Sequence, residues 1–140
     1  MKLTRKQAIQ KCRNHWQWLA EHPEQPKSNY GLLENGVLHD CYACEYSSRM
    51  PEQYSPNCDK CFLLFLWCGY NVKTKNKTII NKYKKSEPYH YHSCEFSSAS
   101  PYKKWKTNCG SLAVRKKAAL KIVEACDALL KKYKKVNRLG

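Results

Sequence analysis

Four cysteines near the middle of the chain have the spacing of a zinc site. Two residues separate Cys41 from Cys44 and Cys58 from Cys61, and thirteen residues lie between the two pairs. Two residues between thiolates let one tight turn direct both sulfur atoms to a common point, and two such turns complete a tetrahedron about zinc. We therefore expect one structural Zn²⁺ bound by these four residues. The alternatives are two local disulfides or a redox-active cysteine pair.

More residues of metal-binding type follow this motif. His90, His92 and Cys94 alternate along the chain, so an extended strand would direct all three to one face. They could form a second zinc site with Cys68 or Cys109, or Cys94 could replace a primary ligand. Because a histidine and cysteine face without paired tight turns is more often ordinary packing and surface, we expect a single zinc ion.

Zinc with four protein thiolates has no open position for water or substrate, so we expect this metal to be non-catalytic. The chain also lacks the zinc-deaminase, Walker, His-Glu-x-x-His and Gly-x-Ser-x-Gly patterns. Its 11 acidic residues leave few candidates to hold the catalytic metal of a nuclease. We therefore expect no enzyme activity, with a zinc-anchored nuclease as a less favoured alternative.

Positive charge is concentrated in the second half of the 140-residue chain. The formal net charge is +15, and residues 1–70 carry 8 basic and 7 acidic side chains, whereas residues 71–140 carry 18 basic and 4 acidic ones. Self-repulsion on this scale favours a negatively charged partner, most commonly nucleic acid. The alternative is a solvated lysine face that serves solubility.

Aromatic residues are interleaved with these lysines, a mixture that suits nucleic acid. Lysine neutralises phosphates, and an aromatic ring can stack on a base for about 1–3 kcal/mol. Because arginine is scarce, we expect binding without sequence specificity. The predicted binding residues are Lys73, Lys75, Lys77, Lys82, Lys84, Lys85, Lys103, Lys104, Trp105, Lys106, Arg115, Lys116, Lys117 and Lys121.

An N-terminal helix is predicted within residues 1–22. Thr4 can cap this helix, and Gln7 stands three residues later, at the spacing of a capping box. Apolar residues then recur with a helical period, at Ile9, Cys12, Trp16 and Leu19.

A second amphipathic helix is predicted over residues 111–133, with Ser111 as its cap and a frayed tail after Tyr133. Its apolar side contains Ala119, Ile122, Val123, Cys126, Leu129, Leu130 and Tyr133. Its basic side contains Arg115, Lys116, Lys117, Lys121, Lys131 and Lys132. Cys12 and Cys126 lie on the apolar sides of the two helices, so we expect both in the core.

Between the helices we expect the zinc loop and apolar run of residues 41–68, a lysine-rich insertion over 72–85 and a short strand over 89–96. The predicted fold is α+β: one small domain, residues 1–140, with two flanking helices packed on the zinc loop and short antiparallel strands.

An intracellular location is expected. Nine cysteines cannot all pair within the chain, and the segment after Met1 lacks the apolar region of a signal peptide. The longest apolar run, residues 62–68, is far shorter than the roughly 20 residues of a membrane-spanning helix. We therefore expect a cytoplasmic protein with no membrane partner.

The order of features resembles a family of small, largely uncharacterised bacteriophage zinc-binding proteins. The motifs that carry the resemblance are Trp16-Gln17-Trp18-Leu19, Cys41-x-x-Cys44-Glu45-Tyr46, Cys58-x-x-Cys61, Cys94, Ser100-Pro101-Tyr102-Lys103-Lys104-Trp105 and the basic closing helix. The resemblance implies that the matched cysteines form the metal site, with Cys94 as a further ligand, and that Tyr102 and Trp105 pack the closing helix against it.

Phage origin would add a second class of function. A small, stable phage protein can bind and inhibit a host factor, such as a defence or transcription complex. We expect a non-catalytic, zinc-stabilised basic protein that binds nucleic acid or a host nucleoprotein complex. The alternative is a protein-protein inhibitor of a host defence or transcription factor.

Overall fold

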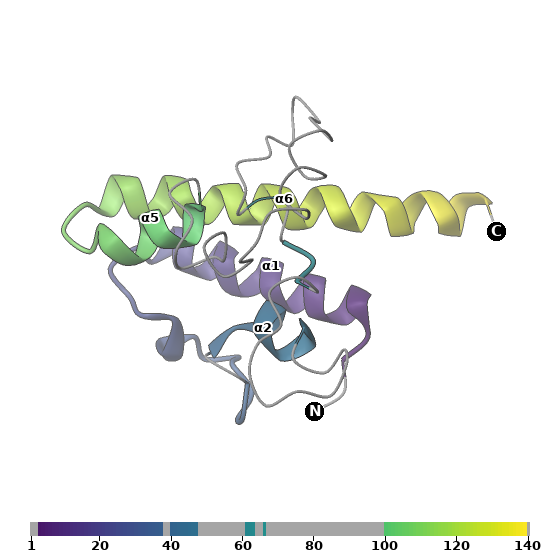
Figure 1. Cartoon of the computed structure of the whole chain (residues 1–140), viewed down its shortest axis with the longest axis horizontal. Helices are drawn as coiled ribbons and strands as arrows, with labels where there is room; N and C mark the ends of the chain where they lie inside the picture. The colour runs from purple at the N-terminus through teal and green to yellow at the C-terminus, as the bar shows by residue number, and fades with distance from the viewer. Residues whose placement is uncertain (1–2, 38–39, 48–60, 64–65, 67–99, 140) are drawn as a thin grey trace, which may run out of the picture.

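Two antiparallel helices form the centre of the fold: α1, Arg5–Glu21, and α6, Leu112–Leu139. The computed structural model describes residues 3–37, 40–47, 61–63, 66 and 100–139, with side chains as far as residue 133. A guanidinium hydrogen bond of 3.0 Å from Arg5 to the Tyr133 hydroxyl joins one end of the helix pair. Figure 1 shows α1 and α6 lying side by side.

Helix α1 begins and ends where the sequence predicts. The Thr4 hydroxyl accepts a hydrogen bond from the Gln7 amide at 3.1 Å, and the Gln7 side chain accepts one from the Thr4 amide at 3.0 Å. This reciprocal pair satisfies two amides that the first turn leaves without helical partners. The four predicted apolar positions of this helix are all buried.

Helix α6 starts after Ser111, whose hydroxyl accepts a hydrogen bond from the Val114 amide at 3.4 Å. Its predicted apolar face is buried against α1, with Tyr133 partly exposed at the end. The helix continues to Leu139, beyond the predicted end at residue 133. Its start and its buried face therefore follow the sequence pattern, whereas its length exceeds the prediction.

Shorter helices complete the described fold. Helix α5, Pro101–Thr107, packs on the first part of α6, and helix α2, Tyr42–Ser47, packs on α1 (Figure 1). Ser100 caps α5 by accepting a hydrogen bond from the Lys103 amide at 3.3 Å. A 3₁₀ turn, η1, spans Lys27–Asn29.

The prediction of an α+β fold is wrong. The residues that the structure describes contain helices and no strand, and their core is built between helix faces. The apolar sides of α1 and α6 pack on each other, whereas the prediction packed the two helices on a zinc loop and short strands. The lysine-rich insertion over 72–85 and the strand predicted over 89–96 lie outside the described residues. None of the described helices is both long and apolar enough to cross a membrane.

Candidate functional site

Cys41 lies directly before helix α2, and the chain turns sharply to place it there. The preceding residue, Asp40, has a φ of 50°, in the left-handed region that aspartate tolerates better than most residues. The Cys41 carbonyl then accepts the first helical hydrogen bond, from the Glu45 amide at 2.9 Å. The Cys41 sulfur accepts a hydrogen bond from the Cys44 amide at 3.3 Å. This turn therefore holds Cys41 at the start of the short helix that contains Cys44.

The surroundings of Cys41 favour its thiolate. A side-chain hydrogen bond from Cys44 is the largest influence, and it is opposed by burial. The positive charge of Lys27 and hydrogen bonds from the amides of Cys44 and Ala43 also lower the pKa of Cys41. Together they lower the pKa of Cys41 from 9.0 to about 6. Cys41 is therefore largely a thiolate at neutral pH, which is the form of cysteine that can bind a metal.

Cys61, from the second pair, has a related hydrogen bond. Its sulfur accepts the Leu63 amide at 3.4 Å. Phe62 and Leu63 are buried in the core and hold this short segment against the helices. An amide directed at sulfur stabilises negative charge, as it does at Cys41. Cys41, Cys44 and Cys61 are all free of disulfides.

Cys12 and Cys126 face each other between α1 and α6. Both are buried, as predicted for core residues. A hydrogen bond between the two thiols, followed by burial and by the negative charges of neighbouring cysteines including Cys41 and Cys61, raises the pKa of Cys12. Cys12 therefore stays a neutral thiol, in contrast to Cys41. Cys41 and Cys61 are partly buried and pack against the same core.

Three of the four predicted zinc ligands belong to the described chain. Cys58 and the additional candidates Cys68, Cys94, His90 and His92 lie outside it. Within residues 3–37, 40–47, 61–63, 66 and 100–139, no three His, Cys, Asp or Glu side chains are gathered closely enough to hold a metal. The amide hydrogen bonds to Cys41 and Cys61 and the acidic pKa of Cys41 nevertheless fit thiolate ligands of zinc.

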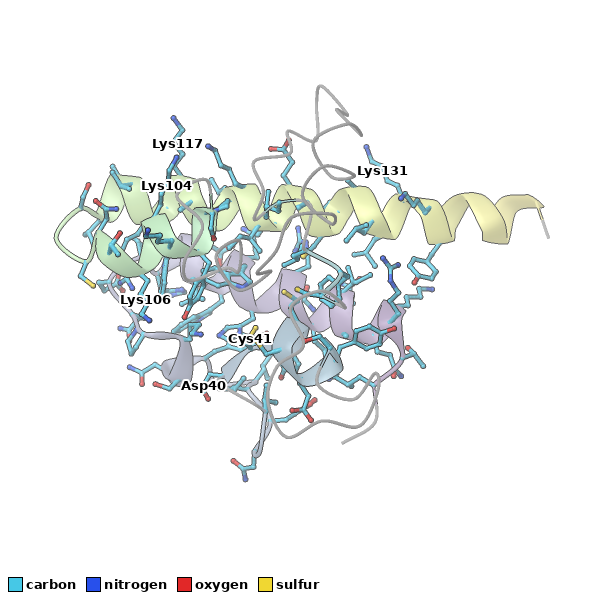
Figure 2. The ribbon with its side chains drawn as sticks, in the orientation of Figure 1. Asp40, Cys41, Lys104, Lys106, Lys117 and Lys131 are labelled. Atoms are coloured by element: carbon cyan, nitrogen blue, oxygen red, sulfur yellow. The ribbon has the colours of Figure 1, made fainter. Side chains whose placement is uncertain are left out.

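Exposed lysines gather on helices α5 and α6. We define the α5–α6 basic surface as the exposed lysines of these two helices: Lys104, Lys106, Lys116, Lys117, Lys121, Lys131 and Lys132. Figure 2 shows Lys117 and Lys131 projecting from the side of α6 that faces away from α1. Lys103 is partly exposed on α5. The remaining predicted binding lysines, Lys73, Lys75, Lys77, Lys82, Lys84 and Lys85, lie outside the described residues.

Trp105 and Arg115 were predicted as binding residues, but they are 4% and 7% exposed. The Arg115 guanidinium lies 3.8 Å from the centre of the Trp105 ring. It also donates hydrogen bonds to the carbonyl oxygens of Trp105 and Pro23 at 3.1 and 2.7 Å. Neither side chain is therefore available on the surface. Their contact connects α6 to α5, and Arg115 also connects α6 to the segment after α1.

Trp105 and Tyr102 pack in the core beside Trp16 of α1. The ring of Trp16 meets both edge to face, with centroids 5.2 Å from Trp105 and 5.9 Å from Tyr102. The two α5 rings therefore pack α5 onto α1, and Trp105 also contacts α6 through Arg115.

Lys27 is a residue of this site that sequence reasoning missed. Its ammonium lies 4.6 Å from the centre of the Tyr102 ring and influences the pKa of Cys41. Figure 2 shows Cys41 near the middle of the molecule, beside α1. Because the fold alone brings residue 27 to this position, no local spacing could have identified it.

Comparison with known proteins returns no relative. No family model matches the chain, and neither the curated proteins nor the solved structures compared with it include a significant match. The resemblance to the phage family therefore stays a prediction from the sequence motifs.

Proposed function

We propose that this protein is a non-catalytic, zinc-stabilised nucleic-acid-binding protein that acts in the cytoplasm, the host cytoplasm if it is phage-encoded. The observation that carries the proposal is the α5–α6 basic surface. Residues 101–133 contain nine basic and two acidic side chains, and one of the two acids, Asp127, is paired with Arg13 at 3.1 Å. A surface with this excess of positive charge suits the phosphates of nucleic acid, alone or within a nucleoprotein complex.

Zinc has a structural role in this proposal. Cys41, Cys44 and Cys61, with Cys58, would hold the ion between helix α2 and the buried segment at Leu63. Bound zinc would link these segments and supply folding free energy to a small core. With four thiolates around it, the ion would have no position for a substrate.

Salt dependence tests the binding proposal. Labelled single-stranded and duplex oligonucleotides are titrated with purified protein across a range of salt concentrations. Counterion release predicts that the logarithm of the association constant falls linearly with the logarithm of the salt concentration. Absence of binding at low salt, or binding that does not respond to salt, would refute direct phosphate contact.

A second candidate function is inhibition of a host protein. Three large apolar side chains are exposed on the first half of α6: Leu112 at 49%, Leu120 at 41% and Val114 at 39%. Exposed apolar residues beside lysines suit a protein partner with an acidic surface. Capture from nuclease-treated host lysate separates the two candidates, because a protein partner survives nuclease and a nucleic-acid tether does not.

A further inference from the structure

Helix α6 extends beyond the helix on which it packs. The guanidinium of Arg5, the first residue of α1, donates a hydrogen bond to the Tyr133 hydroxyl of α6 at 3.0 Å. Helix α6 then continues through residues 134–139 and ends at Leu139. Figure 1 shows this yellow end of α6 projecting past the purple start of α1. We call residues 134–139 the α6 arm.

The basic positions of the α6 arm share one side of the helix. The arm contains Lys134, Lys135 and Arg138 and no acidic residue. Together with the exposed Lys131, these positions are spaced at i, i+3, i+4 and i+7, which is the spacing of one helix face. Figure 2 shows Lys131 on the side of α6 that faces away from α1. The basic positions of the arm therefore continue the outward side of α6.

The size and charge of the α6 arm match the major groove of duplex DNA. An α-helix with its side chains is about 10–12 Å in diameter, and six residues of helix are about 9 Å long. The major groove of B-form DNA is about 12 Å wide and about 8.5 Å deep, and the phosphates of both strands border it. The carbonyl end of a helix carries about half a negative charge, which is small against the three positive charges of the arm.

We propose that the α6 arm binds in the major groove of duplex DNA, with its basic residues on the phosphates that border the groove. The inference rests on the nucleic-acid binding of the proposed function, and it names the partner and the element that recognises it. Duplex RNA is not an equivalent partner, because its major groove is deep and too narrow for a protein element to enter. The α5–α6 basic surface contacts phosphates outside the groove, and the arm adds the preference for duplex DNA.

Two changes to the arm separate its charge from its helical structure. The triple variant Lys134→Gln/Lys135→Gln/Arg138→Gln removes three charges and keeps residue types that favour a helix. Val136→Pro keeps every charge but interrupts the helix, because proline removes a backbone hydrogen bond and clashes with the preceding turn. Val136→Ala is its matched control, since alanine favours the helix. Affinity for a DNA duplex and for an RNA duplex of the same sequence is measured by fluorescence anisotropy at several salt concentrations.

The wild type should bind the DNA duplex more tightly than the RNA duplex. If each basic residue of the arm neutralises one phosphate, the triple variant should reduce the slope of log affinity against log salt on DNA by about 3. Its slope on RNA should stay close to that of the wild type. Val136→Pro should lose the preference for DNA over RNA although it keeps every charge, and Val136→Ala should match the wild type.

Equal reductions of the slope on DNA and on RNA in the triple variant would overturn the inference, because net charge alone would explain them. DNA binding by Val136→Pro that equals that of Val136→Ala would also overturn it, because the helical arm would be dispensable. Both results leave nucleic-acid binding intact. A wild-type protein that binds neither duplex nor single-stranded DNA at low salt would instead refute the proposed function itself. The two arm variants test the claim independently, so loss of folding in one leaves the other decisive.

Discussion

The surroundings of Cys41 lower the pKa of its thiol, whereas those of Cys12 raise it. The hydrogen bond from the Cys44 side chain, the Lys27 ammonium and the amides of Cys44 and Ala43 favour the thiolate, and burial opposes it. Cys12, a short distance away in the core, has its pKa shifted upward. The same residue type therefore serves as a candidate ligand at one position and as neutral packing at the other, because the hydrogen-bond donors differ.

His15 should make the stability of the protein depend on pH. It is buried against Tyr30 and Tyr42, and burial, the largest influence, lowers its pKa below 6.5 despite the hydrogen bond to the Lys27 carbonyl. The charge of Lys27 lowers the pKa further, and Asp40 raises it. In the unfolded chain the imidazole binds its proton at a higher pH. Its contribution to stability is therefore complete above pH 6.5 and is lost as the pH falls toward the folded-state pKa.

Denaturant unfolding of the wild type and of His15→Gln, from about pH 8 to about pH 5, measures this contribution. The variant should lose less unfolding free energy than the wild type over this range. Protonation of the cysteines affects both proteins equally, so the difference between the two pH profiles measures the contribution of His15. Parallel pH profiles would contradict the prediction.

At the scale of elements, Arg115 of α6 contacts two other segments of the chain. Its contacts with Trp105 and Pro23 connect α6 to the end of α5 and to the chain after α1. Arg115→Ala removes two hydrogen bonds from a charged donor and the stacking on the indole. We expect a loss of about 3 kcal/mol in the free energy of unfolding, measured with denaturant.

Lys116→Ala is the matched control, because it removes the neighbouring positive charge from an exposed position of the same helix. It should change the unfolding free energy by no more than about 0.5 kcal/mol. Similar losses in the two variants would show that Arg115 acts through general charge and not through its buried contacts.

These elements differ in how far the sequence predicts them. The starts and buried faces of α1 and α6 are predictable because Thr4, Gln7 and Ser111 act locally and the apolar period runs through several turns. Helix α5 is too short to show a period. Trp105 and Arg115 were wrongly assigned to a binding surface. A tryptophan and an arginine among lysines give the same sequence pattern whether their side chains are exposed or packed on each other. The position of Lys27 between His15 and Tyr102 depends on tertiary structure alone, so no sequence pattern predicts it.

At the scale of the whole molecule, the α5–α6 basic surface places exposed lysines on two helices that are joined by a short turn. Lys117 and Lys121 occupy the exposed side of α6, one helical turn apart. If each neutralises one phosphate of duplex DNA, the double variant Lys117→Gln/Lys121→Gln should reduce the slope of log affinity against log salt by about 2. Fluorescence anisotropy at several salt concentrations measures this slope.

Lys6→Gln/Lys11→Gln removes the same number of charges from α1 and serves as the control. Its salt slope should stay close to that of the wild type. Equal reductions in the two double variants would indicate that net charge, and not the α5–α6 basic surface, determines binding.

Metal content coupled to thermal unfolding tests the central claim most directly. Native mass spectrometry of the purified protein should find one zinc ion per chain, and a strong chelator should remove the ion and lower the melting temperature. Replacing Cys41 with serine should abolish both the bound zinc and the response to chelator. A metal-free protein that unfolds cooperatively, with a melting curve that the chelator does not change, would contradict the account.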